Sequence, residues 1–241
     1  MSNPLVRKLD QAGVLDDADR AILKDLSSRA RRIDGRQDLI RAGDRPENVL
    51  LVMDGWACRY KILRNGRRHI MAFLVPGDFC DLHVAILGEM DHNIGTAWGC
   101  TIVEIPCATI DEITANHPRI TRALWWATLT DEATLREWLA NMGQRPADRQ
   151  MAHLLCELLV RLQVAGQATD NSFGFPITQT DLADTLGITP VHVNRVLQDL
   201  KKQGLVLWKS KRVQIPSVEK LKAFAEFDPS YLHLTPRVAY I

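Results

Sequence analysis

The chain has 241 residues, of which 46% are hydrophobic and 24% are charged, and its net charge is +1. This composition is ordinary for a soluble globular protein, and the length allows one large domain or two modest ones. No apolar run approaches the length of a membrane span and the N-terminus lacks the apolar core of a signal peptide, so we expect a cytoplasmic protein without a membrane partner.

Short helices and then short strands are predicted for the first half of the chain. Residues 4–30 read as two helices, because apolar residues recur at helical spacing from Leu15 to Leu26. Between residues 31 and 108, strand-like runs alternate with glycines that recur every eleven residues from Gly55 to Gly99. Asn65-Gly66 is a strong hairpin signal, because both residues tolerate positive φ. We interpret residues 31–108 as an antiparallel β-roll.

A long helix is predicted from Pro118 to Met142, without an internal glycine or proline. Two stripes of residues follow it at alternating steps of four and three, which gives the helix two surfaces to pack against. We expect one surface to meet the β-roll and the other a second copy of the chain; the alternative is a core helix of a monomer. The first stripe is Ile120, Leu124, Ala127, Asp131, Thr134 and Trp138, and the second is Trp125, Thr128, Glu132, Leu135, Leu139 and Met142.

A helix-turn-helix pattern occupies Ile177–Leu205. It follows a break at Gly143–Pro146, a helix to about Val164 and a loop or small hairpin. Thr178 suits an N-cap, Gly187 suits a tight turn, and Thr189 with Pro190 starts a second helix. Two capped helices joined by a glycine-containing turn are typical of DNA-binding proteins.

The outer face of the second helix carries side chains suited to DNA. Arginine bonds two acceptors of guanine, asparagine pairs with adenine, and an exposed valine touches the thymine methyl. The alternative is an ordinary solvated helix face. These residues are Val191, His192, Asn194, Arg195, Gln198 and Lys202.

Local charge supports the DNA interpretation. Residues 192–222 contain eight lysines and arginines but only two acidic residues, and phosphate contacts are mainly electrostatic. The runs Leu205–Trp208 and Val213–Ile215 flank a basic tip and predict a β-hairpin wing whose Lys211 meets the DNA backbone.

The order of these parts resembles the bacterial cyclic-AMP receptor and fumarate-nitrate regulator (Crp/Fnr) superfamily over nearly the whole chain. The best-matching parts are Pro76–Phe79, the long helix and Ile177–Leu205. The resemblance implies an α+β fold with an N-terminal jelly-roll β-roll of the cyclic-nucleotide-binding type, a dimerisation helix and a C-terminal winged helix-turn-helix. It also implies a homodimer on double-stranded DNA with a palindromic operator, and RNA polymerase as a further candidate partner. The expected parts are a sensor domain at 1–116, the helix at 117–143, the DNA-binding domain at 146–228 and a tail at 229–241.

The resemblance also assigns individual DNA contacts. Arg195 falls on the family's recognition-helix arginine, and Asn194 falls where fumarate-nitrate-type members carry a base-facing serine. Val191 replaces the glutamate with which many members read cytosine, which implies a different operator sequence. Further contacts are expected from Thr178, Gln179 and Thr189.

The effector is harder to predict. Cyclic-nucleotide binders hold the ribose with a Gly-Glu pair and the phosphate with an Arg-Ser pair, which fall here on Asp81-Leu82 and around Asp91–Asn93. An aspartate without an arginine repels a phosphate, so we expect weak or no cyclic-AMP binding and an unknown small-molecule effector. The candidate pocket residues are Asp81, Leu82, His92, Asn93 and Trp125.

Other ligands and activities have weaker support. The five cysteines form no C-x-x-C pair and none precedes Cys58, which argues against zinc and iron–sulfur centres. His69, His83 and His92 are potential metal or haem ligands, but the cupin H-x-H signature is missing, so we assign no metal and no cofactor. No catalytic pattern stands out. The remaining alternatives are a metal-binding cupin-type enzyme, a protein-interaction module and an apolar ligand beside the long helix.

Overall fold

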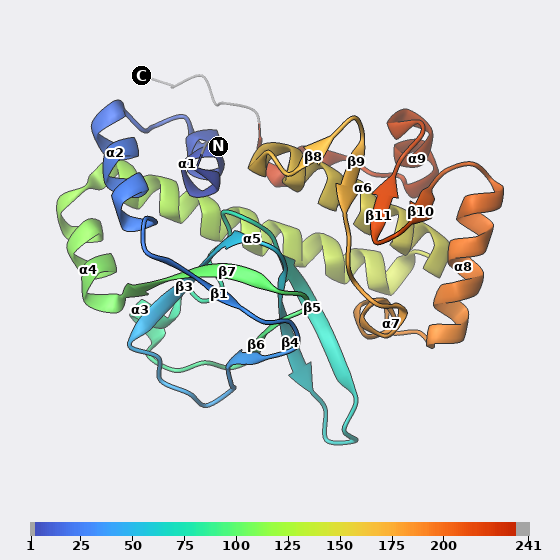
Figure 1. Ribbon diagram of the computed structural model, residues 1–241, viewed down its shortest axis with the longest axis horizontal. Coiled ribbons are helices and arrows are strands. Elements are labelled where there is room, and N and C mark those ends of the chain that lie inside the picture. Colours follow the sequence, from blue (N-terminus) through green and yellow to red (C-terminus); the bar gives the residue numbers. More distant parts are fainter. Residues whose placement is uncertain (1–2, 235–241) are drawn as a thin grey trace.

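A computed structural model describes residues 3–234. Two α-helices joined by a short 3-10 segment start the chain and cover one end of the β-roll (Figure 1). They are α1 (Pro4–Leu9), η1 (Asp10–Ala12) and α2 (Asp17–Leu26). A capping box starts α2, in which Asp16 and Asp19 each accept a hydrogen bond from the other's backbone N–H.

The β-roll consists of two antiparallel sheets. One has the order β1 (Ala30–Ile33), β7 (Cys100–Pro106), β3 (Asn48–Asp54), and the other β2 (Asp38–Ile40), β6 (Asn93–Thr96), β4 (Ala57–Ile62), β5 (Arg68–Leu74). The single-turn helix α3 (Val84–Leu87) lies between β5 and β6 in the chain. The eleven-residue glycine spacing marks turns: Gly55 has a φ of 82°, and a Cβ there would lie 2.3 Å from the carbonyl oxygen of Gly99.

The long helix α5 (Pro118–Gln144) follows α4 (Cys107–Asn116), a helix that is not predicted from the sequence. It continues through Gly143, two residues beyond the predicted end at Met142. Arg145 is extended because the ring of Pro146 disfavours helical backbone in the residue before it, and this is where α5 stops. No helix formed by residues 3–234 combines the length and the apolar content that a bilayer crossing needs.

The C-terminal part has the winged helix-turn-helix architecture. Its elements are α6 (Ala147–Ala165), β8 (Ala168–Thr169), β9 (Ser172–Gly174), α7 (Gln179–Leu186), α8 (Pro190–Lys202), β10 (Leu207–Lys209), β11 (Arg212–Gln214), α9 (Val218–Ala225) and η2 (Pro229–Leu232). The strands form one antiparallel sheet in the order β10-β11-β9-β8, so the predicted wing hairpin is joined to a second hairpin. Of the predicted tail, η2 packs onto the domain, where the Tyr231 hydroxyl donates to Glu157 at 2.9 Å, and residues 235–241 lie outside the described part.

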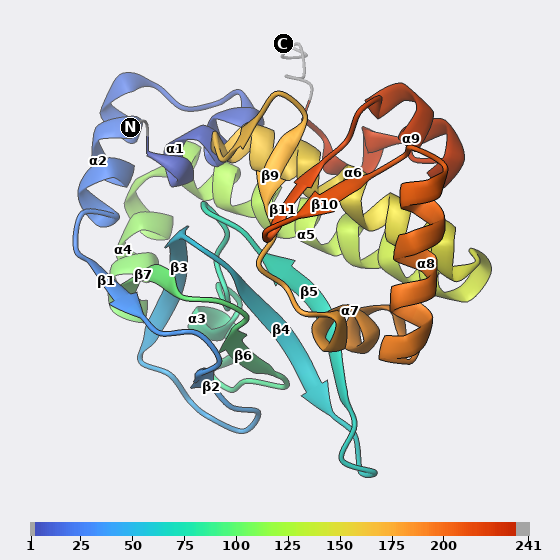
Figure 2. The same cartoon turned by 45° about the vertical axis from the view of Figure 1, so that its right-hand side comes forward.

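The β-roll and the DNA-binding part share a core rather than standing apart (Figure 2). Trp56 and Phe73 of the roll pack with Trp138 of α5 and with Phe175, which precedes α7. The ring centroids of Trp56 and Phe175 are 5.1 Å apart, and those of Phe73 and Phe175 are 5.9 Å apart. This aromatic cluster fixes the helix-turn-helix against the roll.

Candidate nucleic-acid interface

Local capping explains why α7 and α8 start and stop where they do. The Thr178 hydroxyl accepts from Asp181 N at 3.1 Å, and the Asp181 carboxylate accepts from Thr178 N at 3.0 Å, so two free donors of the α7 N-terminus are satisfied. Gly187 ends α7 in the left-handed conformation with a φ of 67°. Thr189 caps α8 through a 3.2 Å bond from His192 N. The structure thus confirms the predicted helix-turn-helix.

One face of α8 is buried and the other is exposed. Its inner face packs into the core of the domain through Val193, Val196, Leu197 and Leu200. The outer face lies on the outer edge of the molecule, free to approach a partner (Figure 1). Val191 is 81% exposed on this outer face.

Most of the predicted contact residues are exposed, but they come from more than one element: Gln179 belongs to α7 and Lys211 to the tip of the wing. Those that are exposed are Gln179, Thr189, Val191, Asn194, Arg195, Gln198, Lys202 and Lys211, and His192 is half-buried. Thr178 is also half-buried, and its hydroxyl donates to Asp181 at 2.6 Å. The primary role of Thr178 in this structure is therefore to cap α7.

The basic tip of the wing contacts the β-roll. The Lys211 ammonium lies 3.7 Å from the centre of the Trp98 ring, a cation–π distance, and Trp98 belongs to the roll. Ser210 and Lys211 both take positive φ, as a two-residue hairpin turn requires. Arg212 donates to the Ser172 hydroxyl at 2.7 Å, which ties the two hairpins together. Lys211 must leave Trp98 if the wing is to meet a phosphate.

The two stripes of α5 have opposite environments. Every residue of the first stripe is buried or half-buried against the same chain. Every residue of the second is exposed, including Trp125 at 70% and Leu139 at 70%. With Leu129, also exposed, these side chains form an apolar surface along α5 that we call the α5 seam: Trp125, Leu129, Leu135, Leu139 and Met142.

The candidate effector residues do not form one group. Asp81 is buried, one of its oxygens accepts from Leu50 N at 2.7 Å, and burial raises its pKa to about 7. Asn93 links Ala42 N to the Tyr60 carbonyl and is therefore structural. Leu82 is half-buried beside Asp81, whereas Trp125 lies on the α5 seam. The fifth candidate, His92, lies in a cluster of possible metal ligands.

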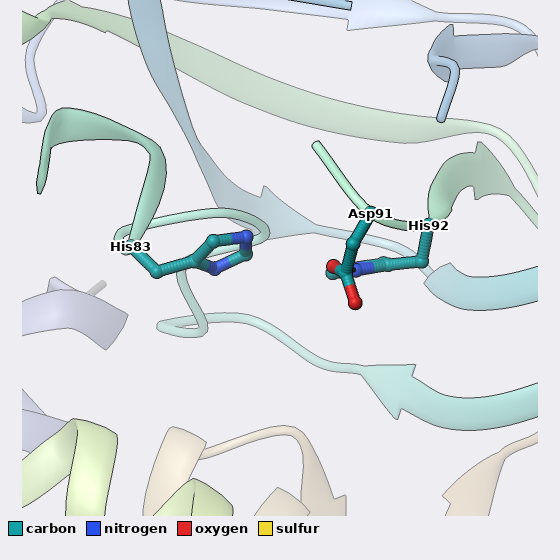
Figure 3. Close-up of side chains that lie close together, drawn as sticks. All are labelled: His83, Asp91 and His92. Carbon is teal, nitrogen blue, oxygen red and sulfur yellow. Dashed lines mark hydrogen bonds and ion pairs between the residues drawn. The ribbon is translucent and has the colours of Figure 1, made fainter. Parts of the chain in front are cut away.

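His92 lies near another histidine, His83, and near Asp91 (Figure 3). The Nδ1 of His92 is 2.6 Å from an Asp91 oxygen, and its ring centre is 5.5 Å from that of His83. Burial lowers the pKa of both histidines and favours their neutral form. Both histidines are potential ligands on sequence grounds, but their spacing does not indicate that they meet, because it is the fold that brings them close. His69 lies apart on β5.

An ion pair links the roll to α5. The Arg59 guanidinium on β4 contacts Asp131 of α5 and donates to the carbonyls of Phe79 and Cys80, each at 3.0 Å. Arg59 is thereby held between the long helix and the segment that leads to α3.

Known proteins share both halves of this architecture. A model of the cyclic nucleotide-binding domain matches residues 30–117, and a model of the Crp-like helix-turn-helix domain matches residues 149–224, together more than half of the chain. The chain is 24% identical to the nitrogen fixation regulation protein FixK of Bradyrhizobium diazoefficiens, over 81% of this chain and 82% of that protein. It is 23% identical to the fumarate and nitrate reduction regulatory protein of Vibrio cholerae, over 88% of this chain and 84% of that protein.

Solved structures agree on the fold. FixK2 from Bradyrhizobium japonicum superposes with a TM-score of 0.71 at 19% identity, over 81% of this chain and 96% of that structure. A CooA mutant from Carboxydothermus hydrogenoformans superposes with a TM-score of 0.63 at 20% identity, over 85% of this chain and 90% of that structure. With its paired family models, its regulator relatives and an exposed α8, the chain belongs to the Crp/Fnr family of DNA-binding transcription regulators.

Proposed function

We propose that two copies of this chain bind a palindromic operator, with one α8 in the major groove of each half-site. The outer face of α8 carries this proposal. Arg195 and Asn194 are exposed there and have the chemistry to read guanine and adenine, while Lys202 is exposed near the end of the helix to meet phosphate.

The α5 seam supports the dimer. Four of its five members project a large apolar side chain more than half exposed, along one helix. A second α5 packed against the seam would remove this apolar area from water. The seam of one copy would then contact the same seam of the other, as a two-fold dimer requires. Half-sites one helical turn apart would then face the two α8 helices.

A signal received at the β-roll would control this dimer. Cyclic AMP is a poor candidate, because Asp91 falls where the family binds the phosphate, and the nearby cation Arg59 is already paired with Asp131. We propose that the chain has no catalytic activity and that it binds its DNA in the cytoplasm. RNA polymerase is a candidate further partner.

Salt dependence of duplex binding tests the proposal. Fluorescence anisotropy of a labelled duplex should show affinity that falls roughly a thousandfold or more between about 50 and 200 mM salt, if the dimer neutralises six or more phosphates. Affinity that is independent of salt would favour the alternative, a helix-turn-helix that packs against protein.

A further inference from the structure

Two histidines from separate segments lie close together in the β-roll domain, and each has a ring nitrogen without a hydrogen-bond partner among the described residues. His83 directly precedes α3, and His92 directly precedes β6. Within residues 3–234 the Nε2 atoms of both are buried and make no hydrogen bond. A buried polar atom without a partner loses the hydrogen bond that water would offer, so such atoms usually have a ligand or a function.

Asp91 adds a third donor at the same place. One ligand atom from each of His83, Asp91 and His92 lies within 4.8 Å of the other two. A tetrahedral ion with bonds of about 2.1 Å holds its ligand atoms roughly 3.4 Å apart, so the three need to close by little more than 1 Å. His83 is only half-buried and borders a single-turn helix, so a side-chain rotation together with a small shift of the segment before α3 can supply this movement.

We propose that His83, Asp91 and His92 bind one first-row divalent transition-metal ion per chain. Two imidazoles and one carboxylate are a donor set for zinc and for non-haem iron, whereas magnesium and calcium prefer oxygen ligands alone. The view in Figure 3 shows the His83 ring facing Asp91 and His92 across a short gap. His92 is 7% exposed, so its Nε2 faces the protein interior rather than solvent.

The same segment of the roll holds the contact to α5. Arg59, which pairs with Asp131 of α5, is oriented by the carbonyls of Phe79 and Cys80, and His83 follows Cys80 by three residues. An ion that draws His83 toward His92 would therefore shift the carbonyls that hold Arg59. We infer that the ion alters how α5 is held and thereby the operator affinity of the dimer. This second step, unlike the site itself, rests on the proposed function.

A direct binding measurement tests the site. Full-length protein is freed of metal with a chelator, dialysed and titrated with Co²⁺, whose visible absorption reports its ligands. We expect one Co²⁺ per chain, displaced by Zn²⁺ and not by Mg²⁺. His83→Ala and Asp91→Asn should each weaken Co²⁺ binding by about tenfold or more, because the first removes a ligand atom and the second removes the negative charge of another ligand. His69→Ala is the matched control, a half-buried histidine of the roll outside the cluster, and should bind like the wild type.

Two results would overturn the site: no stoichiometric Co²⁺ binding by the wild type, or equal Co²⁺ affinity in all three variants and the wild type. Circular dichroism confirms that each variant is folded. Asp91 is exposed and Asn has the same shape, so Asp91→Asn keeps the test informative even if a histidine variant fails to fold.

Operator affinity, measured with and without Zn²⁺, tests the coupling. We expect a change of about fivefold or more for the wild type and none for His83→Ala. If Zn²⁺ binds at the site and operator affinity does not change, the regulatory step is wrong while the site stands. If neither form binds any duplex, it is the proposed function that fails.

Discussion

Arg68 of the β-roll forms an ion pair with Asp181, the residue that closes the capping box of α7. Its guanidinium also donates to Asp184 at 2.8 Å. One carboxylate thus serves two purposes, since it satisfies the free backbone donor at the start of α7 and anchors the helix-turn-helix to β5. These contacts tie β5 to the first helix of the DNA-binding motif.

Removal of this anchor should destabilise the contact between the two parts. We expect Arg68→Ala to lower the free energy of unfolding by about 1 to 2 kcal/mol, because Asp181 is buried and loses its counter-charge. Arg67→Ala is the matched control, an exposed neighbour outside the ion pair, and should change stability by less than about 0.5 kcal/mol. Urea unfolding measures both variants, and equal midpoints would contradict the anchor.

Acid should weaken a second contact between the parts. Burial raises the pKa of Asp78, but the charges of Lys8 and Arg161 outweigh burial and bring the pKa to about 2, below the ordinary 3.8. The folded state therefore holds this proton less tightly than the unfolded chain does. The stabilisation, about 2 kcal/mol, is present above about pH 4 and is lost as the pH falls toward 2.

Asp78→Asn isolates that contribution. Urea unfolding at a series of pH values should show the variant less stable than the wild type near neutrality, with the difference shrinking as the pH falls from about 4 to 2. A difference that stays constant over this range would show that the charge of Asp78 does not stabilise the fold.

The α5 seam predicts the oligomeric state. Leu139→Glu places a charge on the seam and should yield a monomer by sedimentation at micromolar concentration, because a dimer would have to bury that charge. Operator affinity should fall with it, since the half-sites would be bound one at a time. Ile62→Glu, at a position 61% exposed in β4, should remain a dimer. A Leu139→Glu chain that sediments like the wild type would place the dimer interface elsewhere.

Arg195 predicts how the operator is read. Arg195→Ala should cost about 1 to 3 kcal/mol of specific binding per base contact and relax the preference at one position of each half-site. Lys202→Ala should weaken binding to all sequences alike and reduce the salt dependence. Arg29→Ala, at an exposed arginine just before β1, should change neither. Competition titrations with operator variants distinguish these outcomes, and unchanged discrimination in Arg195→Ala would exclude it as a base reader.

Local chemistry made the DNA-binding half predictable. Thr178, Gly187 and Thr189 act within a few residues of their own position, so spacing alone is enough to place α7 and α8. The stripes of α5 are equally local, and the structure shows that the first is buried or half-buried and the second exposed.

The remaining features depend on contacts between distant segments. Arg68 meets Asp181 across more than a hundred residues, and Lys211 meets Trp98 across the gap between wing and roll. Nothing in the spacing of His83 and His92 indicates that their rings face each other, because the turn that returns the chain from α3 to β6 sets their geometry. Trp125 is a candidate effector residue on sequence grounds, whereas the structure places it exposed on the α5 seam.

The most direct test of the central claim is the selection of bound duplexes from a random DNA library by the full-length protein. Two α8 helices related by a two-fold axis predict enrichment of an inverted repeat whose half-sites are centred about 10 base pairs, one helical turn, apart. Enriched sequences with no inverted symmetry, or no enrichment at low salt, would contradict it.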